Sequence, residues 1–169
     1  MDGLELQIGI ISDSHDCLPR ITDAIDRLNS EPIELVLHAG DYSAPFVPRQ
    51  YKALKCHMVG VFGNNDAERV KLGERFTEIG HETRGRFAEV RAGNLRIAVI
   101  HGDESELLRS LIGSGGYDVV VYGHTHEAEV NQEGHTLVIN PGEICGYLTG
   151  KSTYAILDTS EKKAQLYSF

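Results

Sequence analysis

The chain lacks the features that mark several common classes of protein. It has no tryptophan and only three cysteines among its 169 residues, and no two cysteines form a C-x-x-C pair. This argues against a disulfide framework and against a thiolate zinc site. No apolar run approaches the roughly 18 residues of a membrane-spanning helix, and no basic segment precedes the first apolar stretch. We therefore expect a cytoplasmic protein with no membrane contact.

Positive charge is scarce as well. Sixteen lysines and arginines stand against 25 acidic residues, which gives a net charge of −9. An acidic surface repels a phosphate polymer, so long nucleic acid is an unfavourable partner. Apolar residues make up 41% of the chain and charged residues 24%, as in ordinary globular proteins. No repeat or linker divides the sequence, and we expect one domain over residues 1–169.

The apolar segments of the first half predict alternating strands and helices. Runs of branched residues typical of buried strands occur at 4–12, 33–40 and 56–63. Helices are expected at 19–30, around 44–54, and over 66–76, where Asp66 would be an acidic cap. This order predicts parallel strands with crossover helices, and such sheets bind ligands at the carboxyl ends of their strands.

The second half predicts hairpins. Two apolar runs within 86–102 flank Gly93-Asn94, a turn signal. The remaining elements are a helix near 104–113, a strand over 117–123 and two further hairpin pairs at 128–140 and 153–169. Together with the first half they predict two packed sheets with helices outside. An exposed apolar hairpin edge would support a homodimer.

Polar side chains stand at the carboxyl ends of five successive predicted strands. In chain order they are Asp13-Ser14-His15, Gly40-Asp41, Gly63-Asn64-Asn65-Asp66, His101-Gly102 and Gly123-His124-Thr125-His126. Singly, each could be a turn or a helix cap. Because oxygen and imidazole donors recur at all five ends, with glycine allowing a sharp turn at four of them, we predict that they converge on one site.

These motifs, D-x-H, GD, GNND, HG and GHTH in this order, resemble those of the calcineurin-like metallophosphoesterase superfamily, and in particular its small single-domain phosphodiesterase branch. The stretches "HAGDY", "INPGE" and "CGYLTG" extend the likeness over nearly the whole chain. The resemblance implies a four-layer α/β/β/α sandwich. Its two mixed sheets would be flanked by helices, with a dinuclear metal site at the carboxyl ends of the strands.

The resemblance also implies a ligand set. One metal would take Asp13, His15 and His126, the other Asn64, His101 and His124, and Asp41 would bridge them. Two cations about 3.5–4 Å apart need a shared anionic ligand to offset their repulsion, and Asp41 would supply it. Four imidazoles, two carboxylates and an amide suit Mn²⁺ as first choice, with Ni²⁺, Zn²⁺, Fe²⁺ and Co²⁺ as alternatives, better than Mg²⁺ or Ca²⁺.

The implied reaction is hydrolysis of a small phosphodiester, in which a hydroxide bridging the metals attacks phosphorus in line. Asn65 and Asp66 are the catalytic candidates. Larger relatives carry a histidine at the position of Asn65, and an amide can bind phosphate but cannot act as a general acid. Esters with poor leaving groups should therefore be cleaved slowly. Asp66 would cap the following helix or orient a ligand.

Other readings and residues stay open. A phosphomonoesterase or a nuclease is the alternative enzyme, and a non-catalytic protein-binding scaffold, as in the retromer subunit of this fold, is the alternative class. We expect His38 to support the site or pack, and Asn140-Pro141-Gly142 to support the His124 loop. Histidines outside any ligand spacing are expected at the surface or in loops: His57, His81 and His135. The role of Asp103, which follows the HG motif, is open.

Overall fold

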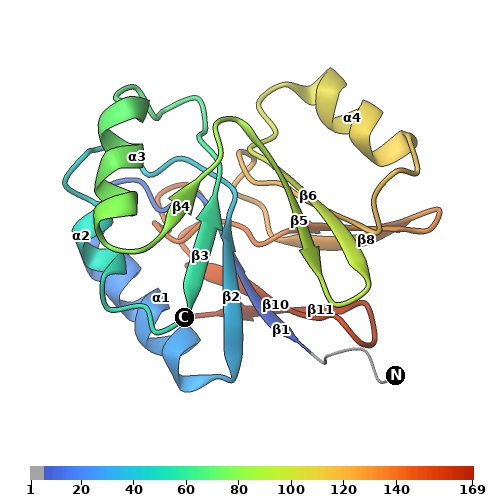
Figure 1. Ribbon diagram of the computed structural model, residues 1–169, viewed down its shortest axis with the longest axis horizontal. Coiled ribbons are helices and arrows are strands. Elements are labelled where there is room, and N and C mark those ends of the chain that lie inside the picture. Colours follow the sequence, from blue (N-terminus) through green and yellow to red (C-terminus); the bar gives the residue numbers. More distant parts are fainter. Residues whose placement is uncertain (1–5) are drawn as a thin grey trace.

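The computed structural model describes residues 6–169, so the first two residues of the predicted strand 4–12 lie outside the described part of the chain. Two mixed sheets stack face to face. Figure 1 shows helices on both sides of the molecule, outside the sheets. This is the four-layer α/β/β/α sandwich that the sequence predicts.

The first sheet has six strands in the order β11-β10-β1-β2-β3-β4. Its strands are β1 (Gln7–Ile11), β2 (Ile33–His38), β3 (His57–Gly60), β4 (Glu82–Thr83), β10 (Thr153–Asp158) and β11 (Lys163–Ser168). The first four are parallel, whereas β10 and β11 form an antiparallel hairpin at one edge. The helices on its outer face are α1 (Leu18–Ser30), α2 (Pro48–Tyr51) and α3 (Arg69–Glu78).

The second sheet has five strands in the order β5-β6-β7-β9-β8. They are β5 (Phe87–Ala92), β6 (Leu95–Ile100), β7 (Val119–Val121), β8 (Glu129–Glu133) and β9 (Thr136–Asn140). Strands β6, β7 and β9 are parallel, and α4 (Ser105–Gly113) packs on the outer face. The predicted hairpins at 86–102 and 128–140 are confirmed. Within residues 6–169, no helix combines the length and the apolar character that crossing a membrane requires.

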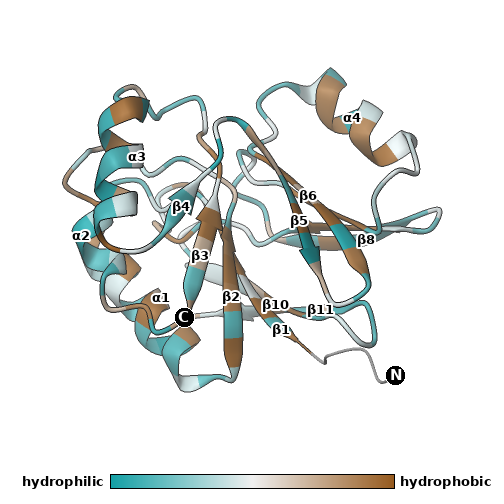
Figure 2. Ribbon diagram, in the orientation of Figure 1, coloured by the Kyte–Doolittle hydropathy of each residue, from teal (hydrophilic) through white to brown (hydrophobic). Residues whose placement is uncertain are grey.

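Alternation along β1 divides its side chains between two hydrophobic layers. Ile8 and Ile10 belong to the core between the sheets, and Ile11 belongs to the core beneath the helices. Gly9 lies on the helix side, where an added Cβ would stand 2.7 Å from a methyl carbon of Leu28 in α1. The missing side chain lets α1 pack closely on the sheet. Figure 2 shows hydrophobic residues interspersed with hydrophilic ones along the helices, as this one-sided packing requires.

Two local predictions are wrong. The helix expected around 44–54 is reduced to α2, because Pro48 has no backbone N–H and therefore stands in the first turn of a helix, where that donor is not needed. Helix α3 starts at Arg69 and not at Asp66, whose carboxylate accepts the backbone amides of Asp41 and Gly63. His81 lies in the loop between α3 and β4, one of the two expected places, but it is buried there and not at the surface, with its Nε2 2.9 Å from the carbonyl oxygen of Tyr51.

Candidate metal centre

The carboxyl ends of the parallel strands in both sheets meet at one place, and contacts between the sheets define it. His101, after β6, points its Nδ1 at the carbonyl oxygen of Ala39, 2.8 Å away at the end of β2. Asp13, after β1, contacts both histidines that follow β7. Its Oδ2 accepts the backbone amide of His124 at 3.0 Å, and its Oδ1 lies 3.4 Å from the Nε2 of His126.

Asp41 lies in the middle of the cluster. Its Oδ2 is 3.3 Å from the Nε2 of His101 and 3.9 Å from the Nε2 of His15. Donor atoms of Asp13, His15 and Asp41 lie within 4.8 Å of one another. The carboxylate of Asp41 thus faces histidines from both predicted ligand groups.

The contacts that follow each join members of the same predicted ligand group. The rings of His15 and His126 stack with their centroids 5.4 Å apart. On the other side of Asp41, the rings of His101 and His124 are 5.2 Å apart, and the Nδ1 of His124 lies 3.1 Å from the Oδ1 of Asn64. All seven predicted ligands therefore come together, in two groups with Asp41 between them.

The backbone is strained at these residues. Among the described residues, seven other than glycine have positive φ, and five of the seven are predicted ligands: Asp13, His15, Asp41, His124 and His126. A positive φ is unfavourable for residues with a Cβ, and it persists where the surrounding structure imposes it, which is commonly at functional sites. The concentration of strain marks the cluster as a site and not as a set of ordinary turns.

Two glycines leave room for the carboxylates. A Cβ on Gly123 would stand 2.6 Å from the Oδ2 of Asp13, and a Cβ on Gly63 would stand 2.8 Å from the Cγ of Asp41. Both distances are far below a normal van der Waals contact. The glycines of the GHTH and GNND motifs thus allow the close approach that the sequence predicts for them.

Asp66 is placed behind the Asp41 loop. Its buried carboxylate accepts four backbone amides, those of Asp41, Tyr42, Ser43 and Gly63, at 2.8 to 3.0 Å. Both oxygens are thereby occupied within the protein. Of the two functions considered for Asp66, helix capping is not observed, and orientation of the loop that carries Asp41 agrees with these contacts.

Asn65 contacts Asp41 directly. Its backbone amide donates to Asp41 Oδ1 at 2.9 Å, and its side-chain amide donates to Asp41 Oδ2 at 2.7 Å. Burial opposes the ionisation of Asp41, but hydrogen bonding with His101 and Asn65 outweighs it and holds the pKa of Asp41 well below its usual range. Asp41 is therefore an anion at neutral pH, as a bridging ligand must be.

His38 and Asn140 support the site from behind. The amide of Gly40 donates to the Nδ1 of His38 at 3.1 Å, and burial lowers the pKa of His38 to about 3, so the ring stays neutral and can accept that bond. The side-chain amide of Asn140 donates to the carbonyl oxygen of Gly123 at 3.1 Å and to the Oγ1 of Thr125 at 2.9 Å. The predicted supporting roles of both residues are confirmed.

Glu143 is a residue that the sequence reasoning missed. It is fully buried, and its Oε2 lies 2.6 Å from the Nδ1 of His126. It also accepts the backbone amides of Tyr147, Leu148 and Thr149. Burial alone would raise the pKa of Glu143, but these hydrogen bonds, with that from His126 foremost, bring it to about 2. Since β9 runs parallel to β7, the strand-end rule used above points to this carboxylate too.

Asp103 forms an ion pair. Both of its carboxylate oxygens lie 2.7 Å from the Nη2 of Arg86, which also contacts Glu104 at 2.9 Å. Some small relatives have a second histidine directly after the HG motif. This chain has Asp103 at that position, and its carboxylate contacts Arg86.

The donor set fits metal ions better than it fits hydrogen bonding alone. The Oδ1 of Asp13 and the Nε2 of His101 are buried without a hydrogen-bond partner among the described residues. The carbonyl oxygen of Ala39 accepts from the Nδ1 of His101, and the carboxylate of Glu143 accepts from the Nδ1 of His126, so each Nε2 is directed at a carboxylate oxygen. A cation between each Nε2 and its carboxylate oxygen would be held by both, and such backing of histidines is typical of metal sites.

Metal addition should therefore stabilise the fold. A divalent ion at 100 times its dissociation constant adds about 2.7 kcal/mol to the free energy of unfolding, so Mn²⁺ should raise the melting temperature in differential scanning fluorimetry. His101→Gln should lose most of this shift. The matched control His57→Gln changes an exposed histidine that is not a predicted ligand, and it should keep the shift. No shift in the wild-type protein would contradict the assignment.

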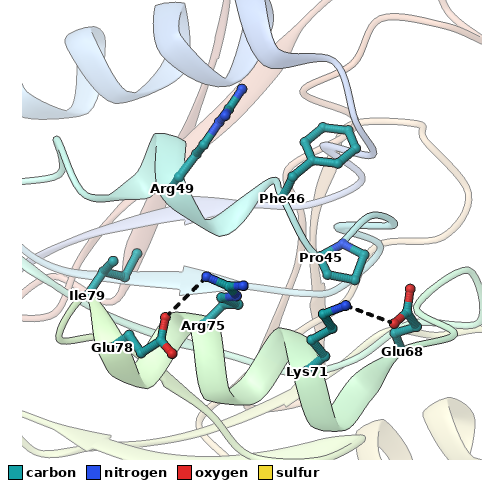
Figure 3. Close-up of a pocket in the computed structure, with 8 residues that line it drawn as sticks. All are labelled: Pro45, Phe46, Arg49, Glu68, Lys71, Arg75, Glu78 and Ile79. Atoms are coloured by element: carbon teal, nitrogen blue, oxygen red, sulfur yellow. Dashed lines mark ion pairs between the residues drawn. The ribbon is translucent and has the colours of Figure 1, made fainter.

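A cavity of about 460 Å³ lies elsewhere on the surface, between α2 and α3. Figure 3 shows its lining residues: Pro45, Phe46, Arg49, Glu68, Lys71, Arg75, Glu78 and Ile79. Two ion pairs lie along it, Lys71 with Glu68 at 3.7 Å and Arg75 with Glu78 at 3.5 Å. None of the predicted ligands lines it, so we place the chemistry at Asp41 and not in this cavity.

Fold and site together define an α/β/β/α sandwich protein with a candidate metal centre at the ends of its strands. Residues 6–162 match the calcineurin-like phosphoesterase superfamily domain, and the chain belongs to this family. The family has dinuclear sites for divalent metals, and the described residues include candidate ligands for such a site.

Known proteins resemble the chain over most of its length. It is 45% identical over 159 residues to phosphodiesterase MJ0936 of Methanocaldococcus jannaschii. The aligned region covers 94% of this chain and 96% of that protein. It is 32% identical to a probable metallophosphoesterase of Methanothermobacter thermautotrophicus, over 80% of this chain and 75% of that protein. A solved structure of an archaeal phosphodiesterase superposes with a TM-score of 0.93 at 42% identity, over 97% of this chain and all of that one. Vps29 of Chaetomium thermophilum shares the fold. It superposes with a TM-score of 0.71 at 17% identity, over 97% of this chain and 96% of that one.

Proposed function

We propose that this protein is a metal-dependent phosphodiesterase that hydrolyses small phosphodiesters at a pair of divalent metal ions. One observation carries the proposal: the Oδ2 of Asp41 lies 3.3 Å from the Nε2 of His101 and 3.9 Å from that of His15, so one carboxylate faces both groups of donors. The likeness to phosphodiesterase MJ0936 over nearly the full length of both chains supports a diester as the substrate.

In this proposal Asp13, His15 and His126 would hold one metal, and Asn64, His101 and His124 would hold the other. The carboxylate of Asp41, which faces histidines of both groups, would offset the mutual repulsion of the two ions. Two such ions would polarise the phosphoryl oxygens and lower the pKa of a bound water to near neutrality. Because the two cations outweigh the charge of Asp13 and Asp41, the site would attract an anion although the chain as a whole carries a net charge of −9.

The chain's own residues would orient these parts. Glu143 fixes the tautomer of His126 by accepting from its Nδ1, and Ala39 does the same for His101. Asp66 holds the loop of Asp41 in position. Asn65, which donates to Asp41, is the side chain best placed to donate to a phosphoryl oxygen, and its amide cannot protonate a leaving group.

Several finer assignments belong to the same proposal. The imidazole-rich donor set favours Mn²⁺ first and Ni²⁺ second. Residues 1–169 would act as one domain in the cytoplasm, where the three free cysteines, Cys17, Cys56 and Cys145, would stay reduced. The homodimer at a hairpin edge stays a prediction.

The test is hydrolysis by Mn²⁺-reconstituted protein of matched monoester and diester substrates. We expect bis(p-nitrophenyl) phosphate to be cleaved faster than p-nitrophenyl phosphate. Replacing the nitrophenyl leaving group with an alkyl group should slow the reaction by the full amount that the rise in leaving-group pKa predicts, because no general acid, worth about 10²–10⁴-fold, offsets it. Faster monoester cleavage would favour the phosphomonoesterase alternative, and metal-independent background rates would favour a scaffold.

A further inference from the structure

The segment 146–150 presents two neighbouring apolar side chains to solvent beside the candidate metal centre. Tyr147 is 60% exposed and Leu148 is 73% exposed. The ring of Tyr147 lies 6.3 Å from the imidazole of His15, measured between centroids, and is tilted by 31° to it. An exposed aromatic face therefore stands next to a predicted metal ligand.

This exposure does not come from a loose loop. The backbone amides of Tyr147, Leu148 and Thr149 all donate to the buried carboxylate of Glu143, which also contacts His126. The same carboxylate thus holds both the segment and a predicted ligand. Burial of these apolar side chains would stabilise the protein, yet the anchored backbone keeps them exposed to solvent. Exposed apolar side chains held in this way commonly mark binding sites.

The ring is also suited to lie beside an anion. The phenol of a tyrosine carries no charge at neutral pH, since its ordinary pKa is about 10. A neutral aromatic face does not repel a phosphodiester, and it offers a stacking surface to an aromatic group attached to it.

We propose that Tyr147 is a specificity-determining residue that stacks against an aromatic ester group, such as a nucleobase or an aryl ring, of a phosphodiester bound at the metal centre. The inference rests on the proposed function. A phosphodiester carries two organic groups. If phosphorus lies at the metal centre, the group on the side of His15 would contact the ring of Tyr147. Leu148 extends the same apolar surface. The preferred substrates are then short nucleotide or aryl diesters, and not dialkyl diesters.

Two substrates with the same leaving group test this directly: the p-nitrophenyl ester of thymidine 5′-phosphate and methyl p-nitrophenyl phosphate. Since the bond that breaks is the same, a difference between them reports on the retained group. Tyr147→Ala should lower kcat/KM for the thymidine ester about tenfold, as expected for the loss of one stacking contact. The methyl ester should change less than about twofold. Tyr147→Phe, which keeps the ring, should behave as the wild type does.

A binding measurement separates this inference from the proposed function. Calorimetric titration of the Mn²⁺-loaded protein with thymidine 5′-methylphosphonate, which is not hydrolysed, should show affinity about tenfold weaker for Tyr147→Ala. The matched control Phe46→Ala removes an exposed aromatic ring from the cavity between α2 and α3 and should leave affinity unchanged. If the wild-type protein cleaves neither ester, the proposed function fails while the titration still decides on Tyr147. Unchanged binding by Tyr147→Ala, an equal loss on both esters, or a loss confined to Phe46→Ala would overturn the inference.

Discussion

Asp41→Asn should lower metal-dependent phosphodiester turnover by about 1000-fold, since the loss of several kcal/mol of charge stabilisation at a two-metal site corresponds to a factor of this size. Asparagine keeps the shape of the side chain, and its one side-chain oxygen can still accept from Asn65. It lacks the charge that would hold two cations close together. Steady-state kinetics with bis(p-nitrophenyl) phosphate and metal content by plasma mass spectrometry measure the two consequences.

The control for this substitution is Asp26→Asn, which removes the same charge from an exposed position on α1. It should retain wild-type turnover and two metals per chain. A similar loss in both variants would show that overall charge, and not the bridging position, controls activity. Turnover and metal content near wild-type values in Asp41→Asn would contradict the assignment of Asp41.

Glu143→Ala should destabilise the folded protein by about 3–5 kcal/mol, because it leaves buried donors without an acceptor. The groups affected are His126 and the amides of Tyr147, Leu148 and Thr149. Urea unfolding followed by circular dichroism gives the change in the free energy of unfolding. Glu143→Gln keeps the size of the side chain and should cost less stability, but it should weaken metal binding about 10- to 100-fold, because it no longer offers a carboxylate to His126.

The matched control for Glu143 is Glu129→Gln, a carboxylate on β8 whose hydrogen bonds are with Tyr122 and Asn131 and not with a predicted ligand. Its metal affinity should equal that of the wild type. If Glu143→Gln binds metal as tightly as the wild-type protein does, Glu143 is a structural residue alone and its contact with His126 has no part in metal binding.

The strands of both sheets, except the two-residue β4, were predictable because their signals are local. Branched apolar runs ended by glycine or polar residues mark the central strands, and Gly93-Asn94 marks the turn between β5 and β6. The ends of the helices were less predictable. Asp66 has the composition of a helix cap, but its carboxylate binds amides of Asp41 and Tyr42, which are more than 20 residues away in the chain.

The candidate site was predictable where it depends on the ends of strands. Asp13, Asp41 and His101 follow strands in the sequence, and parallel pairing brings such residues together. Its supporting contacts depend on tertiary structure instead. Glu143 reaches His126 across 17 positions of the chain and at the same time collects amides from the segment 146–150. No spacing or periodicity in the sequence reports the turn that brings those amides to one carboxylate.

The central claim is that two groups of side chains hold two metal ions with Asp41 between them. X-ray diffraction from crystals grown with Mn²⁺, with data collected on both sides of the manganese absorption edge, tests it most directly. We expect two anomalous peaks about 3.5–4 Å apart, one beside Asp13, His15 and His126, the other beside Asn64, His101 and His124, and both in contact with the carboxylate of Asp41. A single peak, or two peaks that Asp41 does not join, would contradict the account.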